Sequence, residues 1–305
     1  MNRARADAVL LFVALLWGTT MVAQKSANAH IGPILFVGIR FGAAALILLP
    51  LALWESRRPN LVPLQRADWI SAAWIGVCQC LGCWMQQIGL QTTSATNTGF
   101  FTAVYIVLVP FVAWILTRKP PRTLVLVAGI VALYGVWLLG SAEGTGQLSR
   151  GDWIIMASDL VWAAHITLIG HCVGIARRPI LLSFLQCALT GIVSLPIALA
   201  WQPATPEALL AALPAIVYAG ILSSGLAFTL QIIAQRHTPA AEAALIMSLE
   251  AVFAALAGSF VLGEMLSLRA AIGASLILVS VVLVEAGPLM LASAVGRLRP
   301  SALRE

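Results

Sequence analysis

Five ionisable side chains lie inside long apolar stretches of the sequence, where a charge is costly and usually serves a function. They are Arg40, Asp159, His165, Glu242 and Glu250. Glu242 and Glu250 are eight residues apart, which places them near one face of a helix. Glu250 lies deeper, where it could bind a substrate ammonium group or carry a proton. The structural alternative makes it a hydrogen-bonded link between helices.

Three of these residues have structural interpretations that compete with a functional one. Arg40 and Asp159 are expected at similar depth, which favours a structural ion pair or separate contacts at the membrane surface. His165 follows Trp162 by three residues and therefore shares its helical face. This histidine could bind a carboxylate or titrate near neutral pH, or it could join two helices by a hydrogen bond.

Aromatic and amide side chains form a second set of candidates for a binding site. The set comprises Trp17, Gln87, Asn97, Phe101, Tyr105, Trp162, Phe228 and Gln231. Four-residue spacing puts Asn97, Phe101 and Tyr105 on one helical stripe. Rings give a rigid apolar lining and amides give neutral hydrogen bonds, which suits a zwitterion with a bulky side chain. With His165 and Glu250, these residues are the predicted substrate-binding set, and ordinary helix packing is the alternative.

Apolar helices must position these residues. Of the 305 residues, 60% are hydrophobic and only 10% are charged, whereas a soluble domain carries about 25% charged residues. The chain is therefore predicted to be an all-α integral membrane protein. Ten segments are long enough to cross a hydrocarbon core of about 30 Å. The ten predicted transmembrane helices cover 7–24, 33–54, 68–90, 94–117, 123–140, 152–174, 179–201, 208–235, 239–262 and 267–289.

The lysines and arginines predict the orientation of these helices. With the N-terminus inside, 14 of the 18 basic residues are cytoplasmic, three are outside and one, Arg40, lies within a span. Cytoplasmic loops carry such an excess, so both termini are predicted to be cytoplasmic, in a bacterial inner membrane. The net charge of +6 then reflects topology and contact with anionic lipid, and no nucleic-acid partner is expected.

The chain also matches itself at an offset of about 145 residues. Asp7 falls on Asp152 and Trp17 on Trp162. Five spans per copy is an odd number, so the second copy must enter the membrane from the opposite side. Inverted repeats are typical of secondary transporters, whose substrate site lies between the two halves. The predicted units are a first five-helix repeat over 1–145, a second, inverted repeat over 146–290 and a cytoplasmic tail over 291–305.

Several stretches resemble a known family of transporters. The segment Thr238–Glu264, T-P-A-A-E-A-A-L-I-M-S-L-E-A-V-F-A-A-L-A-G-S-F-V-L-G-E, resembles the second repeat of the EamA family of the drug/metabolite transporter superfamily. Its first-repeat counterpart is Ser94–Pro110, and W-G-T-T at Trp17–Thr20 is similar to the opening of the family. The chain departs from the family in having Ala251 where proline is frequent, and Lys119 where the family often has glycine followed by glutamate.

This resemblance implies ten helices and the export of a small metabolite by alternating access. Helices 1, 3, 4, 6, 8 and 9 would surround a central cavity, and exporters of aromatic and other neutral amino acids of the YddG type look most similar. The implied partners are a small-molecule substrate and membrane lipids, and a monomer is expected.

Other functions fit the sequence less well. A sugar-phosphate or nucleotide-sugar carrier would need several basic residues in its cavity, and only Arg40 lies within a predicted span. A drug carrier is a further alternative. A membrane-embedded lipid enzyme or lipid flippase would need a catalytic cluster or a basic groove. The sequence has no P-loop and no H-E-x-x-H motif, so we expect neither an enzyme nor a cofactor or metal.

Overall fold

The computed structural model of the chain describes residues 1–59, 61–140, 148–263 and 267–298. Throughout these residues the regular structure is helical, as predicted. The elements in chain order are α1 (Arg3–Asn28), α2 (Pro33–Ser56), α3 (Arg66–Gly89), α4 (Ala95–Thr102), α5 (Tyr105–Thr117), α6 (Thr123–Gly140), α7 (Arg150–His171), α8 (Val173–Ala176), α9 (Pro179–Trp201), α10 (Pro206–Tyr218), the π-helix η2 (Ala219–Ala227), α11 (Phe228–Gln235), α12 (Ala240–Met247), α13 (Glu250–Leu262) and α14 (Leu268–Leu298).

Seven helical segments of the described chain are long and apolar enough to cross a membrane. They are Arg3–Asn28, Pro33–Ser56, Ala95–Thr117, Arg150–His171, Pro179–Trp201, Pro206–Gln235 and Ala240–Val261. Thr123–Leu138 and Leu268–Val284 are shorter apolar helices, and α3 is helical where the third span was predicted. Large apolar side chains face outward, such as Phe260 at 87% and Trp201 at 80% exposure. Exposed apolar side chains of this size are stable in contact with lipid. The chain is therefore a multi-pass membrane protein.

Several helices begin at residues that favour the first turn of a helix. A proline at the start of α2, α9 and α10 lacks an N–H group that the first turn would leave unused. Helix α7 begins with a capping box, in which the Ser149 and Asp152 side chains each accept a hydrogen bond from the other residue's backbone N–H. The side chain of Asn2 caps α1 by accepting a 3.0 Å bond from the Arg5 N–H.

Two predicted helices are broken in their middle. The single helices expected over 94–117 and 239–262 are each divided, into α4 and α5 and into α12 and α13. At the breaks, Val104 N–H donates to Phe101 C=O and Leu249 N–H donates to Ile246 C=O, both at 3.2 Å. Such three-residue hydrogen bonds tighten the backbone and change the direction of the side chains that follow. Apolar periodicity alone did not predict these breaks.

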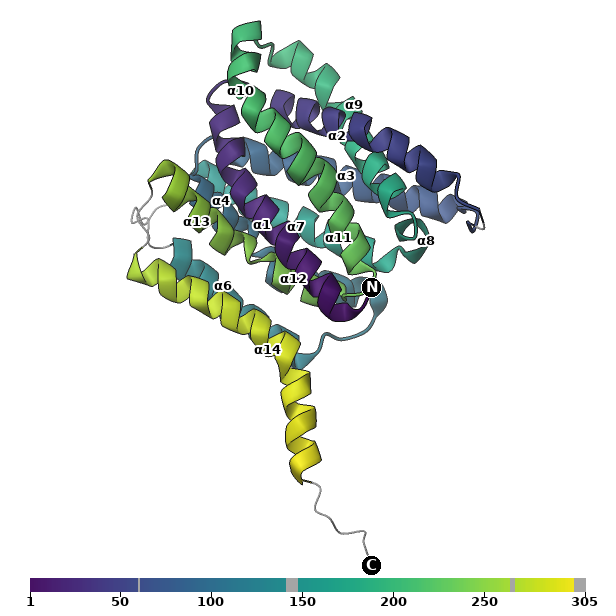
Figure 1. Cartoon of the computed structure of the whole chain (residues 1–305). Helices are drawn as coiled ribbons and strands as arrows, with labels where there is room; N and C mark the ends of the chain where they lie inside the picture. Colours follow the sequence, from purple (N-terminus) through teal and green to yellow (C-terminus); the bar gives the residue numbers. More distant parts are fainter. Residues whose placement is uncertain (60, 141–147, 264–266, 299–305) are drawn as a thin grey trace, which may run out of the picture.

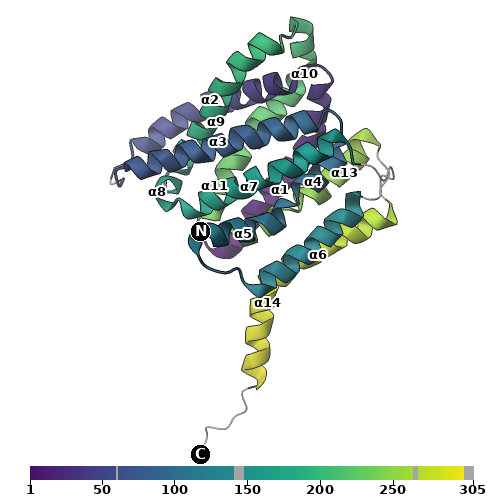
Figure 2. The ribbon, with the colours of Figure 1, turned by 180° about the vertical axis from the view of Figure 1, so that it is seen from behind.

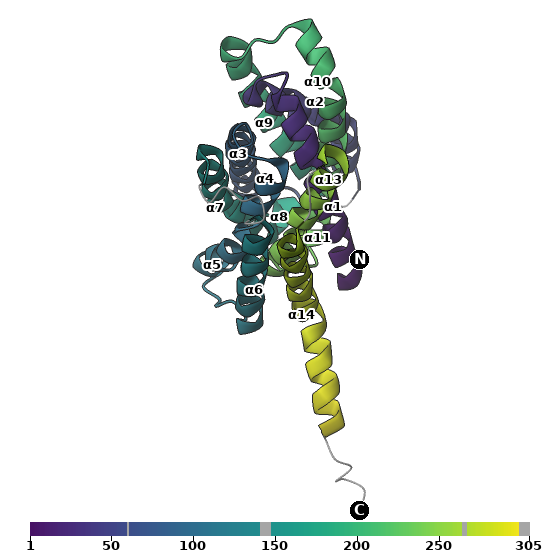
Figure 3. The same ribbon diagram turned by 90° about the vertical axis from the view of Figure 1, so that its left-hand side faces the viewer.

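The helices pack as long antiparallel rods around a common centre (Figure 1). Helix α2 runs along α9, α6 along α14, and α3 against α7. Seen from the side, α3, α5 and α7 lie on one face of the bundle and α1 and α10 on the other (Figures 2 and 3). The last turns of α14 project away from the bundle, and this helix continues past its predicted end at residue 289.

Small residues bring α1 and α13 into backbone contact. A Cβ atom on Gly18 would lie 2.6 Å from both the Glu250 carbonyl oxygen and the Phe253 Cβ. Helix α4 approaches α13 equally closely: a Cβ atom on Gly99 of α4 would lie 2.6 Å from the Cβ of Ala254 on α13. Close approach of this kind needs small residues on the facing helices. It places Glu250 beside α1, next to the turn that carries Trp17.

Candidate functional site

A cavity lies where the central helices meet. The empty space between its walls is about 470 Å³, a figure that includes open solvent. Helices α1, α2, α3, α4, α5, α7, η2, α11 and α13 contribute to its wall. The lining residues are Trp17, Met21, Gln24, Arg40, Cys83, Gln86, Thr102, Tyr105, Trp162, Ile166, Ser223, Phe228, Gln231 and Glu250.

Three aromatic rings from three helices form one wall of this cavity. The Phe228 ring lies 5.0 Å from the Trp17 ring and 6.1 Å from the Trp162 ring, between centroids. The planes of Trp162 and Phe228 are stacked with 19° between them. The Trp17 indole N–H donates a 3.4 Å bond to the Ser223 carbonyl. These contacts form a rigid apolar surface. An aromatic side chain has only two rotatable bonds and therefore loses little conformational freedom when a ligand binds.

Arg40 brings a positive charge to the cavity wall. The guanidinium Cζ lies 4.8 Å from the Phe41 ring centroid and 5.2 Å from that of Phe36, and the residue is 3% exposed. Contact with ring faces stabilises a buried cation. The expected ion pair between Arg40 and Asp159 was wrong: within the described chain neither forms it, and both Asp159 carboxyl oxygens have no hydrogen-bond partner. Arg40 is also too buried for the alternative of a contact at the membrane surface.

Acidic and phenolic groups gather at a second part of the wall. Glu250 is 2% exposed and is the first residue of α13. The Tyr105 hydroxyl lies close enough to interact with the Glu250 carboxyl group, and Asp159 lies near both. Neither the Tyr105 hydroxyl nor Glu250 Oε1 has a hydrogen bond of ordinary geometry. Asp159 itself is fully buried and is not among the residues that line the cavity.

Many polar atoms around the cavity have no hydrogen-bond partner. They are Gln24 Oε1, Arg40 Nε, Tyr105 Oη, Trp162 Nε1, both side-chain polar atoms of Gln231, and Glu250 Oε1. Buried polar groups in proteins are nearly always hydrogen-bonded, so a concentration of unpaired donors and acceptors calls for a bound partner. The arrangement offers donors, acceptors, one cation and one carboxyl group to a polar molecule that also has an apolar part.

Six of the ten sequence-predicted site residues line this cavity. They are Trp17, Tyr105, Trp162, Phe228, Gln231 and Glu250. Trp17 and Trp162, which the sequence offset pairs, line the same cavity as Phe228 and Gln231, which are three residues apart on one helix. That these residues bind a substrate remains a prediction.

The other four predicted residues lie elsewhere. Gln87 donates to the Gln24 carbonyl at 3.1 Å and to Asn28 Oδ1 at 2.8 Å, so it joins α3 to α1. Phe101 packs edge-on against Phe100 at 4.5 Å. Asn97 lines a separate polar pocket together with Lys25 and Asp152. The predicted stripe of Asn97, Phe101 and Tyr105 does not face one space: Tyr105 lines the central cavity, Asn97 the separate pocket, and Phe101 neither of them.

His165 lies behind the aromatic wall. It is fully buried, and its ring meets Trp162 and Phe228 edge-on with centroids 5.5 and 5.9 Å away. Its Nε2 shares a 3.0 Å hydrogen bond with Gln186 Oε1 on α9. The residue has the interhelical hydrogen bond that was one of its two interpretations, and it supports the rings that line the cavity.

Sequence reasoning missed most of the polar wall. Gln24 follows Trp17 by seven residues, two helical turns, and this spacing could have placed it on the same face. Gln86 follows Cys83 by three and donates to Thr102 Oγ1 at 3.0 Å. Arg40 was assigned to structure, because a single intramembrane arginine gives no sign of which neighbour it faces.

An apolar helical exterior around a central cavity that is mainly apolar and carries a few buried polar groups is typical of membrane transporters for small molecules. The chain matches the EamA-like transporter family twice, over residues 4–141 and 149–286. An uncharacterized transporter of Archaeoglobus fulgidus is 31% identical over 284 residues, which cover 93% of this chain and 87% of that protein. The chain therefore belongs to the EamA-like transporter family, and it is a transporter rather than an enzyme.

Two further comparisons agree with the family and the fold. The uncharacterized transporter YwfM of Bacillus subtilis is 26% identical over 290 residues, covering 92% of this chain and 93% of that protein. A solved crystal structure superposes with a TM-score of 0.76 at 17% identity, over 95% of this chain and 99% of the other. At that identity the likeness concerns the fold alone.

Proposed function

We propose that the chain exports neutral amino acids with bulky apolar side chains, by alternating access through the central cavity. The observation that carries the proposal is the set of unpaired polar atoms beside the aromatic wall. Arg40 would bind the carboxylate, Glu250 the ammonium group, and the rings of Trp17, Trp162 and Phe228 the side chain. Opposite charges on one small molecule would offset the cost of burying both protein charges.

The same composition of the wall disfavours the alternative substrates. A dianionic phosphate is bound by several arginines or lysines, and Arg40 is the one basic residue among those that line the cavity in the described chain. A hydrophobic cation such as a drug would use Glu250 and the rings but would leave Arg40 without a counter-charge. A lipid flippase would need a lateral basic groove. A zwitterion uses both charges.

The topology is part of the proposal. We expect the ten transmembrane segments predicted from the sequence to cross the bacterial inner membrane as two inverted repeats, with both termini in the cytoplasm. The family match supports this, since its two copies begin at residues 4 and 149. Helix contacts agree with a twofold relation: α1 packs against α13 as α7 packs against α5, an exchange of first and second repeats.

Transport by purified protein in proteoliposomes tests the proposal. Vesicles preloaded with unlabelled phenylalanine should accumulate labelled phenylalanine by exchange, and 3-phenylpropanoate, 2-phenylethylamine and glucose 6-phosphate should compete weakly. Repeating the assay with an imposed pH gradient reports whether protons are coupled. Exchange of the phosphate ester with no exchange of any amino acid would reject the proposed substrate class.

A further inference from the structure

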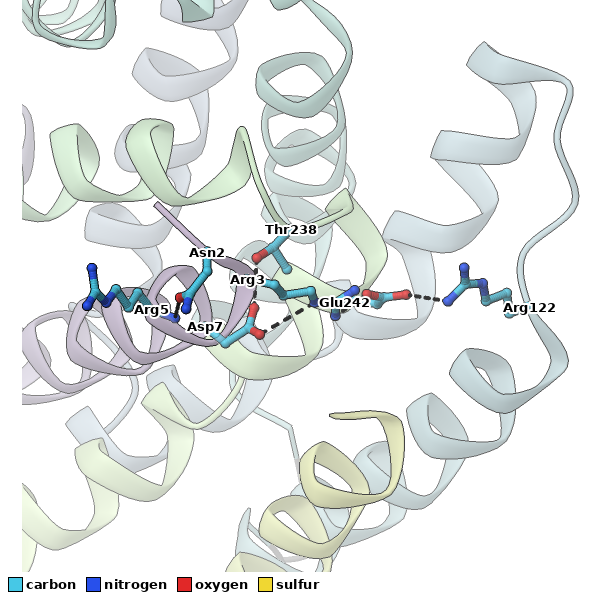
Figure 4. Close-up of polar contacts among 7 residues, drawn as sticks. All are labelled: Asn2, Arg3, Arg5, Asp7, Arg122, Thr238 and Glu242. Atoms are coloured by element: carbon cyan, nitrogen blue, oxygen red, sulfur yellow. Dashed lines mark hydrogen bonds and ion pairs between the residues drawn. The ribbon is translucent and has the colours of Figure 1, made fainter. Parts of the chain in front are cut away.

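The two ends of the bundle are joined by the same kind of hydrogen bond. At the end that holds the N-terminus, Thr238 Oγ1 donates to Asp7 Oδ1 at 2.7 Å (Figure 4). At the opposite end, Thr93 Oγ1 donates to Asp152 Oδ1 at 2.5 Å. An offset of 145 residues relates Asp7 to Asp152 and Thr93 to Thr238, and the two family matches begin at the same offset. The two bonds are thus equivalent contacts at opposite ends.

Each bond connects the two repeats. Asp7 lies in the first turns of α1, and Asp152 lies in the first turn of α7. Thr238 and Thr93 each lie two residues before a helix, α12 and α4 respectively. The helices α1, α4 and α7 and the segment α12–α13 surround the cavity, so each Asp–Thr bond ties together walls that must separate for a ligand to enter or leave at that end.

Charge distinguishes the two ends. At the N-terminal end, Glu242 forms ion pairs with Arg3 and with Arg122, the latter at 3.4 Å, and Arg3 Nε lies 3.5 Å from Asp7 (Figure 4). The offset of 145 puts three neutral residues at the corresponding positions of the other end, namely Leu148, Asn97 and Ser267.

The other end is held differently. Lys25 Nζ donates to the Thr93 carbonyl at 2.6 Å and to the Leu90 carbonyl at 2.9 Å. These bonds order the link before α4, and they join the first repeat to itself rather than to the second. In the described chain the ionic contacts between repeats at the gates are therefore those around Glu242.

We propose that the two Asp–Thr pairs are the gates of the carrier, and that the ion pairs of Glu242 bias it toward closure of the cytoplasmic gate. The proposal rests on the proposed alternating access and on the N-terminal end being cytoplasmic. Both Asp–Thr bonds are formed in this structure. Opening the cytoplasmic gate breaks an Asp–Thr bond and the ion pairs, whereas opening the outer gate breaks the Asp–Thr bond of its own end.

Thiol accessibility from each face of the membrane tests this bias. Cys83 lines the cavity and is 1% exposed, so it reports opening of either gate. The protein would keep Cys83 and have alanine in place of the other cysteines, Cys78, Cys80, Cys172 and Cys187. A membrane-impermeant maleimide is then applied to inverted and to right-side-out vesicles.

Glu242→Gln should raise the labelling rate from the cytoplasmic face by about threefold, the effect of losing one or two partly exposed ion pairs. Asp152→Asn should raise the labelling rate from the outer face instead. Glu55→Gln is the matched control, because Glu55 is a buried carboxylate that accepts a 2.8 Å bond from Leu181 N–H and contacts no gate residue. It should leave both rates unchanged.

The effect of salt on the labelling rate tests the ion pairs without any substitution in the gate. Screening by about 1 M salt weakens exposed ion pairs, so it should raise cytoplasmic labelling of the otherwise unchanged reporter and have little effect on the Glu242→Gln variant. Equal labelling from the cytoplasmic face with and without salt, and with and without Glu242, would overturn the proposal. Labelling needs no substrate, so failure of amino acid exchange with normal gate responses would reject the substrate class alone.

Discussion

Tyr105 and Glu250 occupy equivalent positions in the two halves of the chain, and their side chains meet at the wall of one cavity. Each is the first residue after a break, at the start of a 13-residue helical segment that follows an eight-residue one. Broken helices that meet at a central site are typical of secondary transporters.

The close contact between α1 and α13 predicts a sharp difference between two glycines. Gly18→Ala would put a Cβ atom 2.6 Å from the Glu250 carbonyl oxygen and should lower stability by roughly 1–3 kcal/mol. Gly129→Ala is the control, because its nearest atom would be 3.6 Å away. Thermal unfolding in detergent measures both. Equal melting temperatures for the two variants would contradict the packing described.

The aromatic wall predicts a loss of transport without a loss of folding. Trp17→Ala and Trp162→Ala should each weaken the uptake of phenylalanine about tenfold or more, because each removes a ring that would contact the substrate. Leu182→Ala, which truncates a fully buried side chain remote from the cavity, should instead destabilise the protein by about 2–5 kcal/mol. Unstable tryptophan variants with normal uptake by the surviving protein would assign the two rings to packing.

His165 is expected to support the wall without titrating during transport. Its ring is sealed behind Trp162 and Phe228 and hydrogen-bonded to Gln186. His165→Gln should therefore lower affinity modestly, through movement of the two rings, and should leave the pH profile of transport unchanged. The measurement is exchange across a range of pH values. A shifted or flattened profile would give His165 a protonation role that its position here does not suggest.

The distribution of basic residues predicts which face each loop reaches. Lys119→Cys, in the link between α5 and α6, should react with an impermeant thiol reagent in inverted vesicles and not in intact cells. Lys25→Cys, at the other end of α1, should show the reverse pattern. Labelling of position 119 from outside intact cells would overturn the proposed orientation and, with it, the assignment of the gates.

The sequence predicted the helices better than it predicted the site. Apolar length and prolines located where most helices begin within a few residues, because lipid allows few alternatives to an apolar helix, although α14 runs nine residues past its predicted end. The breaks at 103–104 and 248–249 were missed, since the hydrophobic pattern runs through them unchanged. Tyr105, directly after the first break, lines the cavity, whereas Asn97 and Phe101 before it do not.

Partners across helices were also beyond the sequence. Arg40 and Asp159 are oppositely charged, yet Arg40 lies over aromatic rings of its own helix and both carboxyl oxygens of Asp159 have no hydrogen-bond partner. Depth can be read from position along a helix, whereas the direction of a side chain depends on how each helix is rotated in the bundle. By contrast, Trp17 and Trp162, which the offset of 145 residues pairs in the sequence, both line the cavity.

The most direct test of the central claim measures how much Arg40 and Glu250 each contribute to the affinity for a zwitterion. Calorimetric titration would compare phenylalanine, 3-phenylpropanoate and 2-phenylethylamine on the unaltered protein, on Glu250→Gln and on Arg40→Gln. We predict that the unaltered protein binds phenylalanine most tightly. Glu250→Gln should remove about tenfold of its preference over the acid, and Arg40→Gln a similar part of its preference over the amine. Unchanged affinity of both variants for all three ligands would contradict the account.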